Sequence, residues 1–298
     1  MRGALGQIAS KYRGEAVLMW VVMVWGTTFA LVKDIIVLWP PFALMSVRFA
    51  LAALMFLPWL LRDRGAERET WRNGMILGLL VFAGFALQTL GLAHTTEARS
   101  AFFTAISVLL VPFLGWFFFR LPIVRGTILG VLLGALGIVF LLGQGLGPEV
   151  LQGDYLTLGC ALAFAAQILF LSEKCRKGNL FVLIGVEMLT VMLLSISCSL
   201  ASSEVLPASW PDLPEIVYLG IIATGLTLLA QIYGQRYTSA TRAAFCFAFE
   251  PVFACIFAWF WSGRSLSGLE WAGAACILLA VLVAEKKLVK LEKIILLN

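Results

Sequence analysis

Long apolar runs separated by short polar segments follow one another along nearly the whole chain. Ten runs of about 17 to 27 residues carry either no charged residue or a single interrupting one. About 20 residues of helix suffice to cross the apolar core of a bilayer, and backbone groups in lipid must bond within their own segment. The pattern therefore predicts ten transmembrane helices, over residues 16–32, 35–61, 73–96, 100–119, 126–148, 155–172, 178–203, 216–235, 243–263 and 265–284.

Composition supports an all-α integral membrane protein. Of 298 residues, 61% are hydrophobic and 13% are charged, whereas soluble domains carry about 45–50% apolar and about 25% charged residues. These values exclude an ordinary soluble enzyme, a disordered chain and a coiled coil. Ten spans with short joints leave no room for a separate soluble domain. The single His argues against a His-rich metal or acid–base site.

The net charge of +5 reports topology here rather than affinity for nucleic acid. Ten spans place both termini on one side of the membrane. Of the 22 Lys and Arg residues, Lys33, Arg99 and Arg264 then lie on the opposite side, Arg48 lies within a span, and the remaining 18 share the side of the termini. Because cytoplasmic loops carry the excess of basic residues, we predict a multi-pass protein of the cell inner membrane with cytoplasmic N- and C-termini.

The two halves of the chain resemble each other. An offset of 142 residues relates Gly78, Thr96, Ala98, Ala101 and Phe103 to Gly220, Thr238, Ala240, Ala243 and Phe245. An offset of 139 relates Trp25-Gly26 to Phe164-Ala165 and Arg48 to Glu187. We predict repeat 1 over residues 15–145 and repeat 2 over residues 154–287, and because each holds five spans the second inserts upside down. Inverted repeats are typical of secondary transporters, which bind substrate near the midplane; the alternative is an old duplication kept only for packing.

Several short motifs together resemble the EamA family of the drug/metabolite transporter (DMT) superfamily. They are Trp25-Gly26-Thr27-Thr28-Phe29, Pro41 with Arg48-Phe49, Thr95-Thr96-Glu97-Ala98, Phe249-Glu250-Pro251-Val252 and Gly273. The resemblance covers roughly residues 15–287. It implies ten transmembrane helices in two inverted five-helix repeats around a central cavity, surrounded by spans one, three, four, six, eight and nine. It also implies export of small metabolites, and bacterial members include amino-acid exporters of the YddG type.

Polar side chains recur at helical spacing on several spans, and such residues generally face the bundle interior or a wet cavity. Polar and small residues also bind helices to one another, which is the alternative for any single position. For the set as a whole we predict a shared cavity. Its candidate substrate-binding residues are Trp25, Thr28, Gln88, Thr104, Ser107, Phe164, Gln167, Gln231 and Glu250.

These residue types suit a zwitterionic substrate. Glu250, Thr104 and Ser107 can accept hydrogen bonds from an ammonium group, and the amides of Gln88 and Gln231 can donate to a carboxylate. Trp25 and Phe164, which are counterparts in the two repeats, can form facing apolar walls. Glu250 is also a candidate proton site; the alternative is a structural carboxyl group, in an ion pair or neutral and hydrogen-bonded.

Two features of the spans concern conformational change. Pro112 and Pro251 lie inside spans four and nine, where each should kink its helix. Small residues allow helices to approach closely where a cavity closes. The candidates for such close approach are Gly84, Gly91, Gly225 and Gly234. We expect helices three and four to open against helices eight and nine.

The sequence therefore predicts a secondary transporter that exports small metabolites, in particular aromatic or other apolar amino acids, across the bacterial inner membrane by alternating access. Its partners would be a small-molecule substrate and membrane lipid, not nucleic acid; protons are a candidate coupling ion, and uniport would also fit. We expect no cofactor, no metal, no catalytic residue and no enzymatic activity, and the chain has no G-x-x-x-x-G-K-[ST] motif for ATP hydrolysis. The alternatives are export of another drug-like or nucleotide-type metabolite, a membrane-embedded lipid-modifying protein, and a channel.

Overall fold

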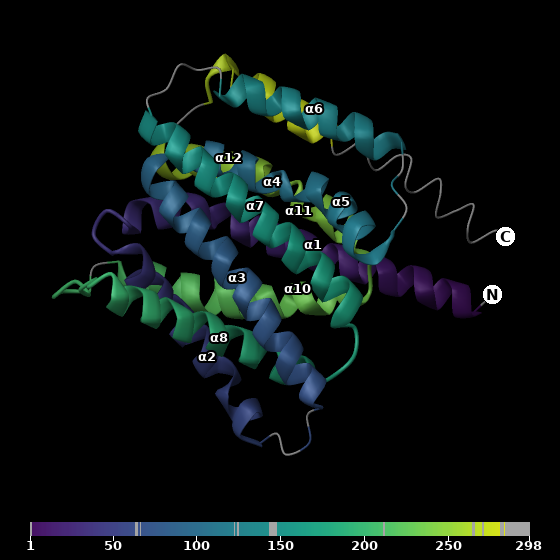
Figure 1. Ribbon diagram of the computed structural model, residues 1–298, viewed down its shortest axis with the longest axis horizontal. Helices are drawn as coiled ribbons and strands as arrows, with labels where there is room; N and C mark the ends of the chain where they lie inside the picture. The colour runs from purple at the N-terminus through teal and green to yellow at the C-terminus, as the bar shows by residue number, and fades with distance from the viewer. Residues whose placement is uncertain are drawn as a thin grey trace.

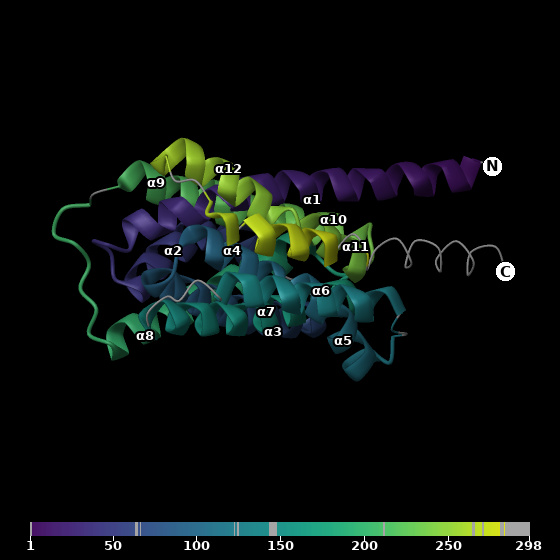
Figure 2. The same ribbon diagram turned by 90° about the horizontal axis from the view of Figure 1, so that it is seen from above.

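The described part of the protein is built from helices and contains no strand (Figure 1). A computed structural model describes residues 2–62, 65, 67–121, 123, 125–142, 148–210, 212–263, 266–269, 271–280 and 283. The helices are α1 (Arg2–Ile35), α2 (Pro41–Arg62), α3 (Arg68–His94), α4 (Glu97–Ala105), α5 (Ser107–Phe119), α6 (Arg125–Leu142), α7 (Pro148–Lys174), α8 (Leu180–Ala201), α9 (Leu213–Val217), the π-helix η1 (Tyr218–Leu226), α10 (Thr227–Arg236), α11 (Ala240–Phe247) and α12 (Glu250–Ser262). Figure 2 shows them side by side along one long axis.

Among the described residues, eight helical segments are long and apolar enough to cross a membrane, so this is a multi-pass membrane protein. They are Arg13–Ile35, Pro41–Arg62, Arg68–His94, Glu97–Phe119, Leu151–Lys174, Leu180–Ala201, Leu213–Arg236 and Arg242–Ser262. Each overlaps one of the ten predicted spans. The predicted fifth and tenth spans overlap two shorter apolar helices, Ile128–Gly137 and Trp271–Ala280. Ten full spans stay a prediction, because part of 126–148 and of 265–284 lies outside the described residues.

Three of the spans are irregular in their middle. The ninth is divided into α11 and α12, and Pro251 stands in the first turn of α12. Because proline has no N–H and its ring clashes with the carbonyl group four residues earlier, the predicted disruption there is confirmed. The fourth span is divided at Ile106, although Pro112 lies further on, inside α5. The eighth span contains the π-helix η1.

Small residues set the closest contacts between helices. A Cβ atom placed on Gly78 of α3 would lie 2.5 Å from the Cβ of Thr190 in α8. A Cβ atom on Gly26 of α1 would lie 2.5 Å from the Cβ of Phe253 and 2.8 Å from the backbone nitrogen of Ala254, both in α12. These contacts hold α3 on α8 and α1 on α12 at backbone distance, as is common between membrane helices.

We expect Gly26→Ala to lower the stability of the protein by about 1–3 kcal/mol, because the new methyl group would overlap the backbone of α12. The matched control is Gly65→Ala, since a Cβ atom on Gly65 has nothing within 4 Å. Thermal unfolding of the two purified variants in detergent measures the difference. Equal melting temperatures would contradict the close packing of α1 on α12.

Candidate functional site

A cavity of about 40 Å³ lies inside the bundle. All nine residues that the sequence analysis predicted for a shared cavity line it: Trp25, Thr28, Gln88, Thr104, Ser107, Phe164, Gln167, Gln231 and Glu250. They come from α1, α3, α4, α5, α7, α10 and α12. The interruptions of spans four and nine fall beside the cavity, because Ser107 begins α5 and Glu250 begins α12.

Sequence reasoning missed six of the lining residues. These are Arg48, Val81, Phe85, Ile168, Leu228 and Phe247. Arg48 adds the second span to the six that the family resemblance implies. The sequence did contain a sign that Arg48 faces the cavity, because Arg48 is the only charged residue within the second span. The five apolar residues carry no such signal, because they resemble any other buried side chain of a span.

Two aromatic side chains form apolar walls of the cavity, and both are held in place. The indole nitrogen of Trp25 donates to the hydroxyl oxygen of Thr227 at 3.0 Å, and its ring centre lies 5.6 Å from that of Phe247. Phe164 lies over Gly84, where a Cβ atom would come within 2.4 Å of its ring. Its ring also meets that of Phe85 edge-to-face at 5.5 Å. The two walls are therefore fixed before any ligand enters.

Three glutamine amides contribute polar groups to the cavity wall. Gln167 of α7 and Gln231 of α10 donate to each other's side-chain oxygen, at 3.4 Å and 3.1 Å. The amide nitrogen of Gln88 donates to the hydroxyl oxygen of Thr104 at 3.2 Å. An amide nitrogen has two N–H groups, so each keeps a second donor for a ligand.

Arg48 is buried, and its guanidinium group lines the cavity. Its Nε donates to the hydroxyl oxygen of Thr224 at 2.6 Å and its Nη2 to the carbonyl oxygen of Ala223 at 3.5 Å, both in η1. Its Cζ lies 4.7 Å from the centre of the Phe85 ring. A guanidinium group has five N–H donors, so further ones are left for an anionic ligand. None of the ion pairs found in the described residues includes Arg48.

The carboxyl group of Glu250 lines the same cavity, with 8% of the residue exposed. Within the part of the chain that the structure describes, this carboxyl group forms neither a hydrogen bond nor an ion pair. The carboxyl group of Glu187 also lacks a hydrogen-bond partner among the described residues. Glu187 differs from Glu250 because it is fully buried and does not line the cavity. The structure thus places one basic and one acidic side chain in a single cavity without pairing them to each other.

A bundle of apolar helices around a central cavity with polar and charged lining is typical of a membrane transport protein. The family model of the EamA-like transporter family matches residues 12–143 and again residues 151–285. The chain therefore belongs to the EamA-like transporter family, within the DMT superfamily.

Similar proteins carry transporter names. A protein of Archaeoglobus fulgidus, named an uncharacterized transporter, is 31% identical over 263 residues, which cover 88% of this chain and 82% of the relative. The uncharacterized inner membrane transporter YedA of Escherichia coli K12 is 26% identical over 270 residues, covering 88% of this chain and 87% of YedA. A solved crystal structure has the same fold, with a TM-score of 0.68 and 21% identity over 92% of this chain and 98% of the other.

Proposed function

We propose that this chain is a secondary transporter that exports small zwitterionic metabolites, in particular amino acids with aromatic or other apolar side chains, by alternating access. The observation that carries the proposal is the presence of Arg48 and Glu250, not paired with each other, in one cavity with apolar walls. A zwitterion brings the opposite charges to both, and so compensates two buried charges at once.

Each part of such a substrate has a matching group. The carboxylate would accept hydrogen bonds from the guanidinium group of Arg48, which suits planar anions. The ammonium group would donate to the carboxylate of Glu250 and to the hydroxyl oxygens of Thr104 and Ser107. The side chain would lie between the aromatic walls. The cavity is only about 40 Å³ in this structure, below the usual range for small ligands, about 300–1,000 Å³, so binding of a metabolite would require the surrounding helices to move apart.

The alternatives fit this cavity less well. A nucleotide-type metabolite carries several negative charges, whereas the lining residues offer one cation and one acidic group that would repel phosphate. A lipid-modifying enzyme would need paired carboxylates or a carboxylate with His, and Glu250 is the single titratable acid among the described lining residues. We further propose that the termini face the cytoplasm and that protons are a candidate coupling ion.

Uptake into proteoliposomes of purified protein tests the proposal. We expect radiolabelled phenylalanine and leucine to be taken up faster than into protein-free liposomes, with and without a pH gradient to test coupling. Phenylalaninamide lacks the carboxylate and N-acetylphenylalanine lacks the ammonium charge. Each should compete at least about tenfold more weakly than phenylalanine, since a hydrogen bond to a charged group contributes about 1.5–3 kcal/mol. Competition by nucleotides but not by amino acids would favour the alternative substrate class.

A further inference from the structure

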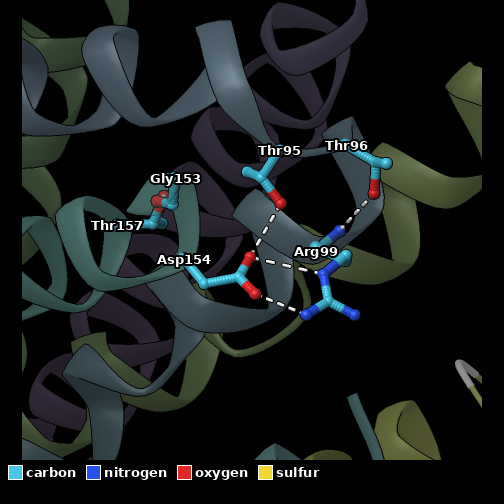
Figure 3. A network of polar contacts seen from close by, with 6 residues as sticks. All are labelled: Thr95, Thr96, Arg99, Gly153, Asp154 and Thr157. Atoms are coloured by element: carbon cyan, nitrogen blue, oxygen red, sulfur yellow. Dashed lines mark hydrogen bonds and ion pairs between the residues drawn. The ribbon is translucent and has the colours of Figure 1, made fainter. Parts of the chain in front are cut away.

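A buried ion pair joins α4 to α7 near one end of the bundle (Figure 3). The guanidinium group of Arg99 contacts both carboxyl oxygens of Asp154, through Nη2 and, at 3.3 Å, through Nε. The hydroxyl of Thr95 donates to the same carboxylate at 2.7 Å. The side chains of Arg99 and Asp154 are 1% and 0% exposed. Arg99, which the charge count assigned to the membrane side opposite the termini, is therefore a buried part of the helix bundle.

Two glycines bring the backbones together beside this ion pair. A Cβ atom on Gly153 of α7 would lie 2.7 Å from the carbonyl oxygen of Gly91 in α3. A Cβ atom on Gly91 would lie 2.8 Å from the carbonyl oxygen of Gly153. Backbones at this distance leave no passage for a substrate between α3 and α7. In this structure Gly91 therefore packs closely against α7.

A second ion pair joins α1 to α11 at the other end of the bundle. Nη1 of Arg242 lies 2.8 Å from Oε1 of Glu15, and the two side chains are 19% and 24% exposed. Lys33, on the same helix as Glu15, donates to the carbonyl oxygen of Thr95 at 2.9 Å and so lies at the first end. Eighteen residues of helix separate Glu15 from Lys33, about 27 Å. Trp25, which lines the cavity, stands midway between them.

The two ends correspond residue by residue. The helix caps of the structure, Thr96 for α4 and Ser239 for α11, correct the offset from 142 to 143 at this point of the chain. An offset of 143 relates Gly91, Thr95, Thr96 and Arg99 to Gly234, Thr238, Ser239 and Arg242, and an offset of 139 relates Gly153 and Asp154 to Gly14 and Glu15. The contacts correspond as well as the positions. The backbone N–H of Arg99 donates to the hydroxyl oxygen of Thr96 at 3.4 Å, and that of Arg242 to Ser239 at 3.4 Å. Gly14 approaches Gly234 as Gly153 approaches Gly91.

The second end is closed less tightly than the first. A Cβ atom on Gly14 would lie 3.0 Å from the carbonyl oxygen of Gly234, and one on Gly234 would lie 3.1 Å from that of Gly14. The hydroxyl of Thr238 is buried and has no hydrogen-bond partner among the residues that the structure describes, whereas its counterpart Thr95 donates to the carboxylate of the ion pair. A buried hydroxyl without a partner is unfavourable, so the second end has an unmade bond.

We propose that these two clusters are equivalent latches, which close the two ends of the cavity in turn. The first latch is Arg99, Asp154 and Thr95, and the second is Arg242, Glu15 and Thr238. In this structure the first latch has all of its bonds, whereas the second lacks the bond between the hydroxyl of Thr238 and the carboxylate of Glu15. We propose that this bond forms when the first latch opens. The proposal rests on the proposed function, because it describes how access to that cavity alternates.

Removing one hydroxyl from each latch tests this proposal. Thr95→Val and Thr238→Val keep the side-chain shape and are matched to each other. Spin labels at 94 and 152 report the first end, and labels at 16 and 237 the second; all four positions are exposed. Distances are measured by electron paramagnetic resonance in proteoliposomes, on full-length protein whose six Cys residues are replaced by Ala. We expect Thr95→Val to lower the ratio of first-end-closed to first-end-open protein by about tenfold, the size of one hydrogen bond to a charged group.

The double variant distinguishes latches from local packing. Adding Thr238→Val to Thr95→Val should reverse the shift, and the label pair at the second end should change in the opposite sense to the pair at the first. The proposal would be overturned if the label distances at the two ends changed in the same direction or independently of each other. It would also be overturned if the double variant kept the ratio of closed to open protein of Thr95→Val. The measurement needs no substrate, so it stays decisive even if amino-acid uptake fails. Circular dichroism and gel filtration confirm folding of each variant.

Discussion

Replacing Arg48 by glutamine is expected to lower the rate of amino-acid transport at low substrate concentration by at least about tenfold. The change removes the positive charge but keeps a hydrogen-bond donor, and a hydrogen bond to a charged partner contributes about 1.5–3 kcal/mol. Arg48 is held over the ring of Phe85 and bonded to Thr224, so it meets a carboxylate in a fixed orientation. Initial rates of phenylalanine uptake into proteoliposomes measure the effect.

Two further variants show whether the charge or the shape of Arg48 matters. Arg48→Lys keeps the charge but loses the planar array of donors, so it should restore only part of the rate. Arg72→Gln is the control, because Arg72 is exposed and pairs with Glu69 at the surface. If Arg48→Gln transports phenylalanine at the rate of the unchanged protein, Arg48 does not bind the carboxylate.

Glu250→Gln is expected to raise the KM for phenylalanine by about tenfold or more, because the neutral amide cannot form an ion pair with an ammonium group. The same variant should lose the preference for phenylalanine over 3-phenylpropionate, which has the carboxylate but no ammonium group. Competition between the two compounds for uptake into proteoliposomes gives this preference directly.

Glu187→Gln is the matched control for Glu250→Gln. Both acids are buried in membrane-spanning helices, but Glu187 does not line the cavity. We expect Glu187→Gln to keep the KM and the preference for phenylalanine over 3-phenylpropionate. Equal effects of the two variants would show that loss of a buried acid, and not loss of an ammonium partner, changes transport.

Helical periodicity identified the cavity residues because the membrane makes polarity informative. In an apolar span, residues such as Gln88, Gln231 and Thr104 cannot face lipid without cost, so they indicate the inward face of their helix. The same reasoning located the eight long spans, because backbone groups in lipid permit little besides helix. For Pro251, local chemistry alone was enough to predict a disrupted helix.

Which groups meet was decided by the tertiary structure. Arg48 and Glu187 are counterparts in the predicted repeats, yet Arg48 lines the cavity and bonds to η1, while Glu187 lies outside the cavity with no hydrogen-bond partner among the described residues. From the sequence, Arg99 was assigned to a loop between two spans. In the structure it is paired with Asp154 of α7, which lies 55 residues further along the chain. No proline stands at Ile106, so the sequence did not predict the division of the fourth span at that residue.

The sequence by itself therefore determined the eight long apolar spans and nine of the residues that line the cavity, because these depend on contacts with lipid and on spacing along a single helix. Only the tertiary structure decided which charges in the described part of the chain stay unpaired, which pair at the ends of the bundle, and which buried hydroxyl groups there, such as that of Thr238, have no partner. Those outcomes depend on distances between helices far apart in the chain. In the case of Glu15 and Arg242, 227 residues separate two side chains whose atoms lie 2.8 Å apart.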